Sequence, residues 1–470
     1  MKYNKTLKDI LKVSASNIIV LFSGVLVGFL LPKIVGIVDY GYYKTYTLYA
    51  TYVGMFHFGI IDGIYLKYGG ENYEDLNRNE FCFYSRFFFF LESAISIIMI
   101  VVSLFFISEE YKFIFTSLAL YLFFHNVTSY YQIISQATSR FSELSHRNII
   151  QSSLISLVIV VLWIVKDFYD VVITYKIYIM LYTLIVVILA VWYMVTYKAI
   201  TFGSKNEKNY KNILFFIITG FPLMVANLCS SLLLTLDRQF VNILFDNITY
   251  ASYAFAYNML SLITTATTAI AMVIYPKLKR SNEEELGSQY PLLMSAISSL
   301  LFLGLTIYFP LNEFVNWFLP QFKSSLLIFR IIFPGLVFSS AITIVMHNYY
   351  KTLGISFKFF TMSLIALFIS ILSNYIAYII FHTTSSISIA SVITMLIWYV
   401  LVERSIIELY MVKWKKRLLY LLSMTMVFYI VTFIGNSIIG AITYILLYIV
   451  ITFIFNKNYL FTTKIKRRVL

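Results

Sequence analysis

The fold of this chain is decided by residues 220–280, which read GFPLMVANLCSSLLLTLDRQFVNILFDNITYASYAFAYNMLSLITTATTAIAMVIYPKLKR. Two apolar runs, each long enough to cross a bilayer, are joined here by a short polar turn that carries Asp237 and Arg238. A spanning helix needs about 20 apolar residues, because its backbone polar groups must all be bonded within the segment. An ionisable pair beside such runs is costly in a membrane and is usually kept for a transport pathway or a helix contact. The stretch therefore predicts two membrane helices around a polar turn.

The composition of the whole chain is that of a membrane protein. Of its 470 residues, 60% are hydrophobic and 12% are charged, whereas about a quarter of the residues in soluble domains are charged. The net charge of +14 is spread over short segments between apolar runs, so it favours membrane topology over nucleic-acid binding. Cys82 and Cys229 lie inside apolar runs and predict neither a disulfide nor a thiolate metal site. We expect no metal, no cofactor and no nucleic-acid partner.

Fourteen segments are long and apolar enough to span a bilayer, which predicts an all-α polytopic membrane protein. They lie at about 13–32, 42–63, 82–107, 111–134, 149–166, 174–197, 213–235, 250–275, 291–310, 326–348, 359–381, 386–402, 418–434 and 437–455. A count of twelve stays open, because the turns at Ser108–Glu110 and Gly435–Asn436 are very short. Residues 1–12 carry lysines among apolar residues and are expected to lie flat on the membrane surface.

The distribution of basic residues predicts the orientation of these spans. Of the 36 lysines and arginines, 28 fall on the side that holds both termini and 8 fall on the other side. Loops rich in lysine and arginine stay in the cytoplasm. An even number of spans with both termini cytoplasmic is therefore expected, and no connector is long enough for a soluble domain.

A weak internal repeat divides the chain. Residues 31–35 (LPKIV) resemble residues 236–241 (LDRQFV), and this alignment places Lys33 opposite Arg238. It predicts two six-helix lobes in parallel repeat around a central cavity, as in transporters built from such repeats. We expect an N-terminal lobe at 1–200, a C-terminal lobe at 201–403, and two further transmembrane helices with a basic tail at 404–470.

Polar side chains share helix faces in three of the predicted spans and are expected to line a hydrated cavity. They are Tyr253, Tyr257, Ser261, Thr264 and Thr268 on the eighth span, Asn227 and Ser231 on the seventh, and Thr47 and Thr51 on the second. The alternative is that small hydroxylated residues let membrane helices approach and bond each other, and for any single serine or threonine this alternative is favoured. For the face of the eighth span as a whole, the cavity is favoured.

Charged residues near the spans have two interpretations as well. Lys33, Lys44, Arg238 and Arg330 lie toward the outer ends of spans, where a long basic side chain either reaches the interface or meets a substrate. Glu92 is the most deeply placed acid and is a candidate for proton or cation coupling, with a polar contact between helices as the alternative. No nucleophile elbow, phosphate-binding loop or zinc-protease motif occurs, so we do not expect an enzyme.

Several short motifs resemble a known family, the bacterial polysaccharide flippases. In the first half they are Leu31-Pro32, Asp39-Tyr40-Gly41-Tyr42-Tyr43, Phe58-Gly59-Ile60-Ile61-Asp62-Gly63 and Lys67-Tyr68-Gly69-Gly70. In the second half they are Gly220-Phe221-Pro222, Asp237-Arg238, Tyr253-Ala254-Phe255-Ala256-Tyr257 and Tyr275-Pro276-Lys277-Leu278. In order and spacing the whole chain is similar to the Wzx-type branch of the multidrug/oligosaccharidyl-lipid/polysaccharide exporter superfamily.

This resemblance implies a fold, a task and a site. The implied task is to move a polyprenyl-diphosphate-linked oligosaccharide across the bacterial cytoplasmic membrane by alternating access, for assembly of O-antigen, capsule or exopolysaccharide. The implied partners are the lipid-linked oligosaccharide, membrane lipids, and the glycan polymerase and glycosyltransferases of the same pathway. The resemblance assigns binding of the diphosphate to Lys33 and Arg238, with Lys44, Arg86 and Arg330 behind them.

Two other functions predict different sequence features. An ion-coupled exporter of drugs or small cations in the same superfamily would need acidic residues along its cavity, and few acids fall inside the spans. A membrane enzyme such as a glycan polymerase would need a large outer loop, which the spacing of the apolar runs does not leave.

Overall fold

The computed structural model describes residues 19–203, 208–279, 281–410 and 414–460, and of these the side chains of 265–273, 275–277 and 457–460 are not included. Every regular element in the described residues is helical. Helices occupy all fourteen predicted ranges, the first of them from Ile19 onward. The all-α polytopic fold predicted from the sequence is therefore confirmed. The predicted surface segment at residues 1–12 lies outside the described residues.

Nine helical segments in the described residues are long and apolar enough, taken singly, to cross a membrane. A tenth consists of two helices, Ser325–Ile332 and Gly335–Thr352, that are bent by 45° at a short break. The break falls at Pro334, which cannot donate a backbone hydrogen bond. One of the nine, Ile19–His57, contains residues 19–32 of the first predicted span and most of the second.

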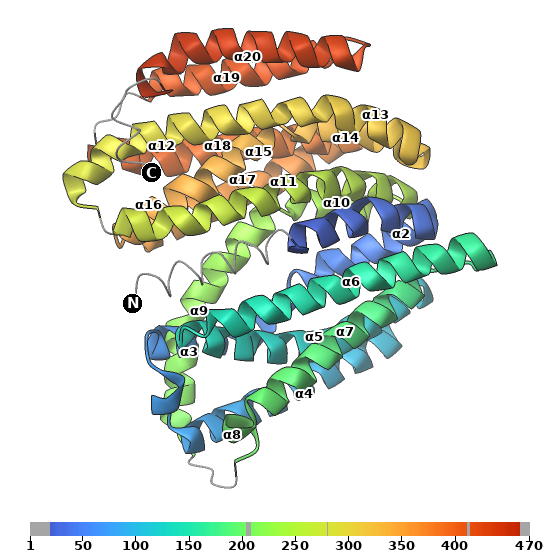
Figure 1. Cartoon of the computed structure of the whole chain (residues 1–470), viewed down its shortest axis with the longest axis vertical. Helices are drawn as coiled ribbons and strands as arrows, with labels where there is room; N and C mark the ends of the chain where they lie inside the picture. The colour runs from blue at the N-terminus through green and yellow to red at the C-terminus, as the bar shows by residue number, and fades with distance from the viewer. Residues whose placement is uncertain (1–18, 204–207, 280, 411–413, 461–470) are drawn as a thin grey trace. The chain divides into compact units, whose positions relative to one another are not determined.

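The chain divides into two compact units, and the first comprises Met1–Leu232. Its elements are η1 (Leu26–Leu30), α2 (Leu31–Ala50), η2 (Val53–His57), α3 (Ile60–Tyr68), η3 (Tyr73–Asp75), α4 (Arg78–Phe106), α5 (Glu109–Ala137), α6 (Phe141–Tyr169), α7 (Tyr175–Thr196), α8 (Lys198–Thr201) and α9 (Tyr210–Leu233). The helix α5 packs against α4 on one side and α7 on another (Figure 1). Buried aromatic rings fill the space between them, among them Phe88, which stacks on Tyr130 with ring centroids 5.1 Å apart.

Two breaks interrupt the first unit where the hydropathy pattern continues. Gly36 has φ of 80° and ψ of 171° inside the helical run Leu31–Ala50, a conformation that glycine adopts without strain. The carbonyls of Lys33 and Ile34, just before this break, accept hydrogen bonds from Nζ of Lys166 at 3.1 and 2.6 Å. The second break, at Phe58 and Gly59, has two successive left-handed residues, with φ of 48° and 79°.

The helices α3 and α9 cross at a contact that only glycine allows. A Cβ atom at Gly220 would lie 2.0 Å from the carbonyl oxygen of Gly59, and one at Gly63 would lie 2.3 Å from that of Phe216. Because α9 is fastened to α3 in this way, it belongs to the first compact unit, which ends at Leu232. The lobe boundary expected from the sequence, at residue 200, lies before α9.

The second compact unit comprises Leu233–Leu470. Its elements are α10 (Leu236–Leu244), α11 (Asn247–Lys279), α12 (Glu283–Gly304), η4 (Leu305–Ile307), α13 (Tyr308–Phe318), η5 (Pro320–Phe322), α14 (Ser325–Ile332), α15 (Gly335–Ala341), η6 (Ile342–Met346), α16 (His347–Thr352), α17 (Ser356–Phe381), α18 (Thr384–Tyr410), α19 (Lys415–Val431) and α20 (Ser437–Leu460). Within this unit α17 packs along α18, and α19 and α20 form an antiparallel pair that contacts α12 through α20 (Figure 1).

A buried ion pair fastens this C-terminal helix pair to the rest of the second unit. Arg417 at the start of α19 donates to the carboxylate of Glu403 in α18, and the two residues are 7% and 1% exposed. The same carboxylate oxygen accepts hydrogen bonds from the hydroxyls of Tyr399 at 3.1 Å and Tyr290 at 3.3 Å. The charge of Glu403 is therefore neutralised only while α19 stays in place.

The substitution Arg417→Met is expected to lower the free energy of unfolding by about 3–5 kcal/mol, because it leaves Glu403 as a buried charge without a countercharge. Thermal or denaturant unfolding of the purified protein in detergent measures this. Arg404→Met is the matched control, since Arg404 pairs with Glu408 at 2.9 Å on the surface, with side chains 78% and 64% exposed. Such an exposed pair contributes about 0–1 kcal/mol. Equal losses in the two variants would contradict the assigned role of Arg417.

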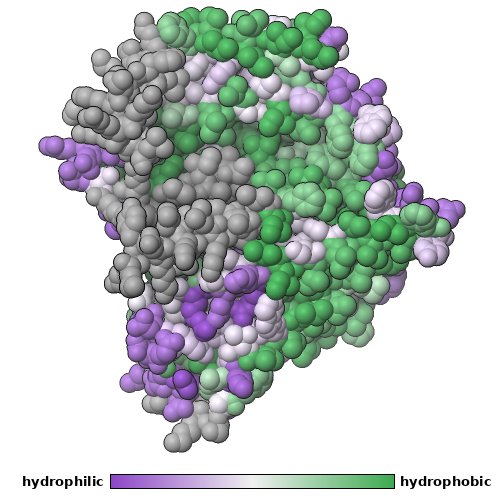
Figure 2. All heavy atoms as spheres, viewed as in Figure 1, coloured by the Kyte–Doolittle hydropathy of each residue, from purple (hydrophilic) through white to green (hydrophobic). Residues whose placement is uncertain are grey.

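The outer faces of the helices are apolar, as expected for surfaces that meet lipid. Phe105, Phe106 and Ile438 are 78%, 80% and 72% exposed. Figure 2 shows this apolar surface in green over α20 and, in the first unit, over α6 and α7. Soluble proteins rarely expose apolar patches of such extent. The described helices therefore use lipid as the solvent for their outer side chains.

Candidate functional site

The polar turn of residues 220–280 folds into a compact cluster in the second unit. The helix α10 starts after Thr235, and α11 starts after a turn at Phe245 and Asp246. Asp246 fixes this turn, because its carboxylate accepts from the hydroxyl of Thr249 at 2.6 Å and from the backbone N–H groups of Ile248 and Thr249, each at 3.0 Å. Hydrogen bonds from the Thr249 side chain and backbone lower the pKa of Asp246. This stabilisation is therefore present at neutral pH and is lost as the pH falls through that lowered pKa.

Asp237 is the centre of the cluster. It is 3% exposed, and its carboxylate accepts hydrogen bonds from the hydroxyls of Tyr253, at 2.8 Å, and Tyr257. Its other carboxylate oxygen accepts from the backbone N–H of Arg238 at 2.8 Å. A buried carboxylate is tolerated when it is bonded in this way. The cluster therefore holds α10 against the N-terminal part of α11.

Arg238, the neighbour of Asp237, is half-buried. Its Nη2 donates to the carbonyl of Leu234 at 3.1 Å, and its guanidinium carbon lies 4.8 Å from the ring centroid of Tyr257. Its Nε is buried and has no hydrogen-bond partner among the described residues. The contacts orient the guanidinium. A planar donor fork of this kind suits phosphate oxygens.

Tyr253 and Tyr257, which the sequence analysis expects to line a cavity, lie in the core of the second unit. They are 0% and 7% exposed, and their hydroxyls are bonded to Asp237. The physical reason is that the carboxylate of Asp237 needs donors, and the two tyrosines lie one helical turn apart on the facing side of α11. Here the hydroxyl face of the eighth span serves helix packing.

Further along α11 the polar face is exposed. Ser261 is exposed and Thr264 is half-buried, and their hydroxyls donate to the carbonyls of Asn258 at 2.7 Å and Ser261 at 2.9 Å. Such bonds to a preceding carbonyl are common for serine and threonine in membrane helices. The side chain of Thr268 lies outside the described residues. Asn227 and Ser231 on α9 are exposed as well.

The predicted cationic residues of α2 lie on either side of its break. Lys33 is exposed and stands three residues before Gly36. Lys44 is half-buried, with Nζ 5.2 and 5.4 Å from the ring centroids of Tyr40 and Tyr43. Near them, Thr47 is half-buried and donates to the carbonyl of Lys44 at 3.1 Å. Thr51 is exposed and donates to that of Leu48 at 2.6 Å.

The remaining two predicted cations contact parts of their own unit. Arg86 is exposed at the start of α4, and its Nη2 donates to the carbonyl of Gly203, after α8, at 2.7 Å. Arg330 in α14 places its guanidinium carbon 4.6 Å from the ring centroid of Phe433, between α19 and α20. Both contacts join neighbouring elements, so these two residues have a structural role in addition to the predicted one.

Glu92, the predicted coupling residue, is fully buried in α4. Its Oε2 accepts from Nδ2 of Asn126 in α5 at 2.8 Å, and the same nitrogen donates to the carbonyl of Val53 at 3.1 Å. Sequence patterns do not point to Asn126, because it lies inside an apolar helix. It is also far from Glu92 along the chain, so no helical spacing links the two residues. A polar amide within a long apolar segment is the signal that could have found it.

Replacing Asp237 tests the cluster of α10 and α11. We expect Asp237→Ala to destabilise the protein by about 1–3 kcal/mol for each tyrosine hydroxyl that loses its acceptor. Asp237→Asn keeps an acceptor oxygen and is expected to cost less. Thermal unfolding of purified protein measures both variants. An Asp237→Ala protein as stable as Asp237→Asn would show that Asp237 is not the acceptor of these hydroxyls.

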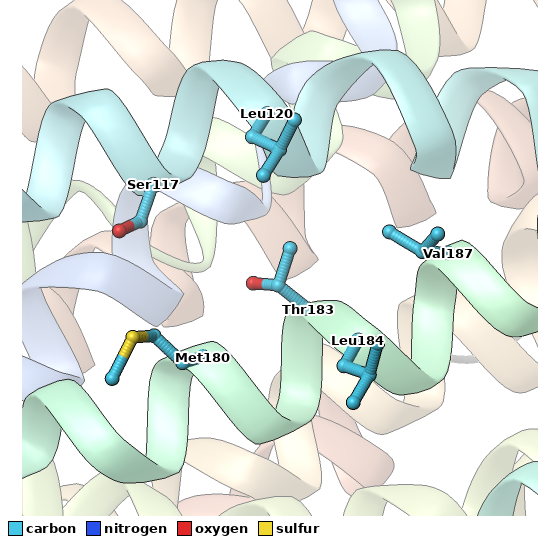
Figure 3. Close-up of a pocket in the computed structure, with 6 residues that line it drawn as sticks. All are labelled: Ser117, Leu120, Met180, Thr183, Leu184 and Val187. Carbon is cyan, nitrogen blue, oxygen red and sulfur yellow. The ribbon is translucent and has the colours of Figure 1, made fainter.

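A surface pocket lies between α5 and α7 in the first unit (Figure 3). Its volume is about 220 Å³, and it is lined by Ser117, Leu120, Met180, Thr183, Leu184 and Val187. The lining is apolar except for two hydroxyls, one of which, on Thr183, is buried. A pocket without a cation does not suit a diphosphate, so we do not assign the headgroup to it.

The helical units and their apolar outer faces define a class first, that of polytopic α-helical membrane proteins. The chain belongs to the family described as polysaccharide biosynthesis protein, whose model matches residues 6–282. No curated protein matches the sequence. The resemblance to proteins of polysaccharide biosynthesis predicted from the sequence motifs is thereby confirmed.

Solved structures of transporters share the fold. The lipid II flippase MurJ in an inward closed conformation has a TM-score of 0.67 and 15% identity, over 96% of this chain and 99% of that chain. An inward-facing multidrug resistance MATE family transporter of the MOP superfamily has a TM-score of 0.55 and 14% identity, over 86% of this chain and 96% of that one. A Vibrio cholerae MATE transporter has a TM-score of 0.54 and 12% identity, over 87% and 100%. At these identities the likeness concerns the fold alone.

Proposed function

We propose that this protein is a flippase that translocates polyprenyl-diphosphate-linked oligosaccharide repeat units across the bacterial cytoplasmic membrane. The cycle is alternating access of two six-helix lobes, with the lobe boundaries near residues 200 and 403 and both termini in the cytoplasm. The products serve the assembly of O-antigen, capsule or exopolysaccharide. The other members of the pathway, a glycan polymerase and glycosyltransferases, are its functional partners.

One observation supports a lipid-linked substrate over a small drug. The structure titled as a lipid II flippase matches 96% of this chain, whereas the MATE transporters match 86–87% of it while being matched over 96–100% of their own length. A layout of twelve helices would leave α19 and α20 without counterparts. Membership of a polysaccharide biosynthesis family agrees with a sugar-bearing substrate.

The substrate chemistry fits the positions of the cations. A diphosphate that crosses a bilayer needs a countercharge, because an unpaired charge in hydrocarbon is costly. We assign this task first to Lys33 and Arg238, which precede a helix break in their respective units, at Gly36 and at Phe245. Lys44, Arg86 and Arg330 are secondary. The polar residues that would contact the sugars are the exposed Asn227, Ser231, Ser261 and Thr51 and the half-buried Thr264.

The experiment is removal of the gene from its bacterium, followed by return of a plasmid copy. The proposal expects loss of surface glycan and accumulation of lipid-linked oligosaccharide that an external glycosidase cannot reach in spheroplasts. The plasmid copy should restore both properties. Normal surface glycan in the deletion strain, together with new sensitivity to cationic drugs, would instead favour the ion-coupled exporter.

A further inference from the structure

We propose that Glu92 and Asn126 form a proton-binding site inside the first unit, beside the helix break at Val53–Gly59. Its use in driving transport rests on the function proposed above, whereas its existence as a site does not. The site lies where α4 packs against α5.

The hydrogen-bonding groups of Glu92 and Asn126 are all paired only if Glu92 carries a proton. Both side chains are 0% exposed, and the one hydrogen bond between them runs from Nδ2 of Asn126 to Oε2 of Glu92 at 2.8 Å. The two remaining oxygens, Oε1 of Glu92 and Oδ1 of Asn126, are buried and have no hydrogen-bond donor among the residues that the structure describes. Both atoms are acceptors when the acid is ionised, and a proton on Oε1 turns Glu92 into a donor as well. A protonated acid can then pair with the amide through two hydrogen bonds.

No fixed charge takes the place of this proton. Among the described ion pairs none includes Glu92. The titratable groups on the adjoining elements are bonded to others: His57 of η2 accepts from the N–H of Gly59 at 3.0 Å and lies 3.7 Å from Asp62 of α3, and His125 of α5 bonds the hydroxyl of Tyr121 at 3.0 Å.

The cations on α4 and α8 do not neutralise the pair either. Arg86, six residues before Glu92, donates to the carbonyl of Gly203, and Lys198 on α8 is exposed. An ionised Glu92 would therefore be a buried charge without a countercharge, which is costly.

A metal ion fits the site less well than a proton. Hard cations take about six or more oxygen ligands, and the pair offers two unused oxygens. The carbonyl of Val53 already accepts from Asn126 at 3.1 Å. Among the described residues no group of three or more histidine, cysteine, aspartate or glutamate side chains could hold a metal.

The site is connected to the break between α2 and α3. Nδ2 of Asn126 bonds both Glu92 and the carbonyl of Val53, which begins the short helix η2. That helix ends at His57 and is followed by Phe58 and Gly59, whose backbone is left-handed. A Cβ at Gly59 would lie 2.3 Å from the backbone nitrogen of Phe221 in α9, so the backbone of the break is in close contact with α9. The helix α9 then runs to the end of the first unit at Leu232.

The proton therefore affects this break, because Glu92 binds it with different affinity when η2 is held in place and when the break opens. With the proton on Oε1 of Glu92, the amide of Asn126 can bond the acid and Val53 together and hold η2 in place. When the proton leaves for water, the carboxylate needs hydration, which the closed packing does not allow. The unloaded site thus favours a conformation in which the break opens, and the two states differ in free energy by their differential proton affinity.

The test is infrared difference spectroscopy of the purified full-length protein during a pH change. We expect the C=O band of a protonated carboxylic acid to decrease as the pH rises, and Glu92→Gln to lack this band. Glu284→Gln, which replaces an exposed acid at the start of α12, is the matched control and should keep it. A band that persists unchanged in Glu92→Gln would overturn the proposal. Loss of the band on exchange of K⁺ for Na⁺ at constant pH would overturn it too, since the ligand would then be a cation.

A second readout separates the site from the proposed function. If the protein is a flippase, the pH dependence of flipping should flatten in Glu92→Gln and Asn126→Leu by comparison with Glu284→Gln. An unchanged pH profile in both variants would refute the coupling. If gene deletion leaves surface glycan intact, the flippase assignment fails, while the infrared band still decides whether Glu92 binds the proton.

Discussion

Replacing Arg238 by alanine is expected to lower surface glycan at least about ten-fold while the amount of protein in the membrane stays the same. A hydrogen bond to a charged group contributes about 1.5–3 kcal/mol, and about 1.4 kcal/mol corresponds to a ten-fold change in binding. The guanidinium is held over Tyr257 and by the carbonyl of Leu234, yet its Nε has no partner in the described structure. We expect the same loss for Lys33→Ala, which the internal repeat places at the matching position.

Two kinds of variant control this result. Arg238→Lys keeps the charge and loses the planar donor fork, so it should retain part of the activity. Arg404→Ala removes an exposed surface charge and should have no effect. Quantitative glycan staining and membrane immunoblots measure the two quantities. Intact glycan in both Arg238→Ala and Lys33→Ala would remove the diphosphate role from these residues.

Substituting Gly220 by leucine is expected to prevent the first unit from folding. The new Cβ would lie 2.0 Å from the carbonyl oxygen of Gly59 and 2.5 Å from the backbone nitrogen of Gly63. These are backbone atoms, which cannot turn aside as a flexible side chain can, so α3 and α9 must separate. Overpacking a tight contact typically costs about 1–3 kcal/mol, and here the separation of two helices adds to that cost.

Fluorescence-detected gel filtration of a tagged protein measures the effect of Gly220→Leu. We expect aggregation and loss of the monodisperse peak. Gly54→Ala is the control, because a Cβ at Gly54 meets no atom within 4 Å and its backbone is not left-handed. A monodisperse Gly220→Leu protein with the wild-type melting temperature would contradict the described crossing of α3 and α9.

The helical class and the positions of the apolar segments could be predicted from the sequence because a bilayer imposes one strong rule. Each spanning segment must bond its backbone internally and present apolar side chains to lipid, and both demands show in local composition. The breaks at Gly36 and at Phe58–Gly59 left no such mark, since the apolar runs continue through them. Nor could the close approach of Gly59 and Gly220 be predicted, because it depends on residues far apart in the chain.

The charged residues of the candidate site could be predicted from the sequence, whereas their hydrogen-bond partners could not. Asp237 and Arg238 are conspicuous as charges beside long apolar runs. The burial of Tyr253 and Tyr257 against Asp237 requires that α10 fold back on α11, which periodicity alone does not reveal. The same holds for Glu92, whose depth was readable and whose bond to Asn126 comes from the packing of α4 on α5.

The most direct test of the central claim uses the purified protein alone in liposomes that contain a fluorescent polyprenyl-diphosphate oligosaccharide. A membrane-impermeant quencher added outside reports which leaflet holds the sugar. The account predicts that the wild-type protein exposes the inner-leaflet population to the quencher and that Arg238→Ala fails to do so, although it reconstitutes equally well. Equal quenching in protein-containing and protein-free liposomes would contradict it.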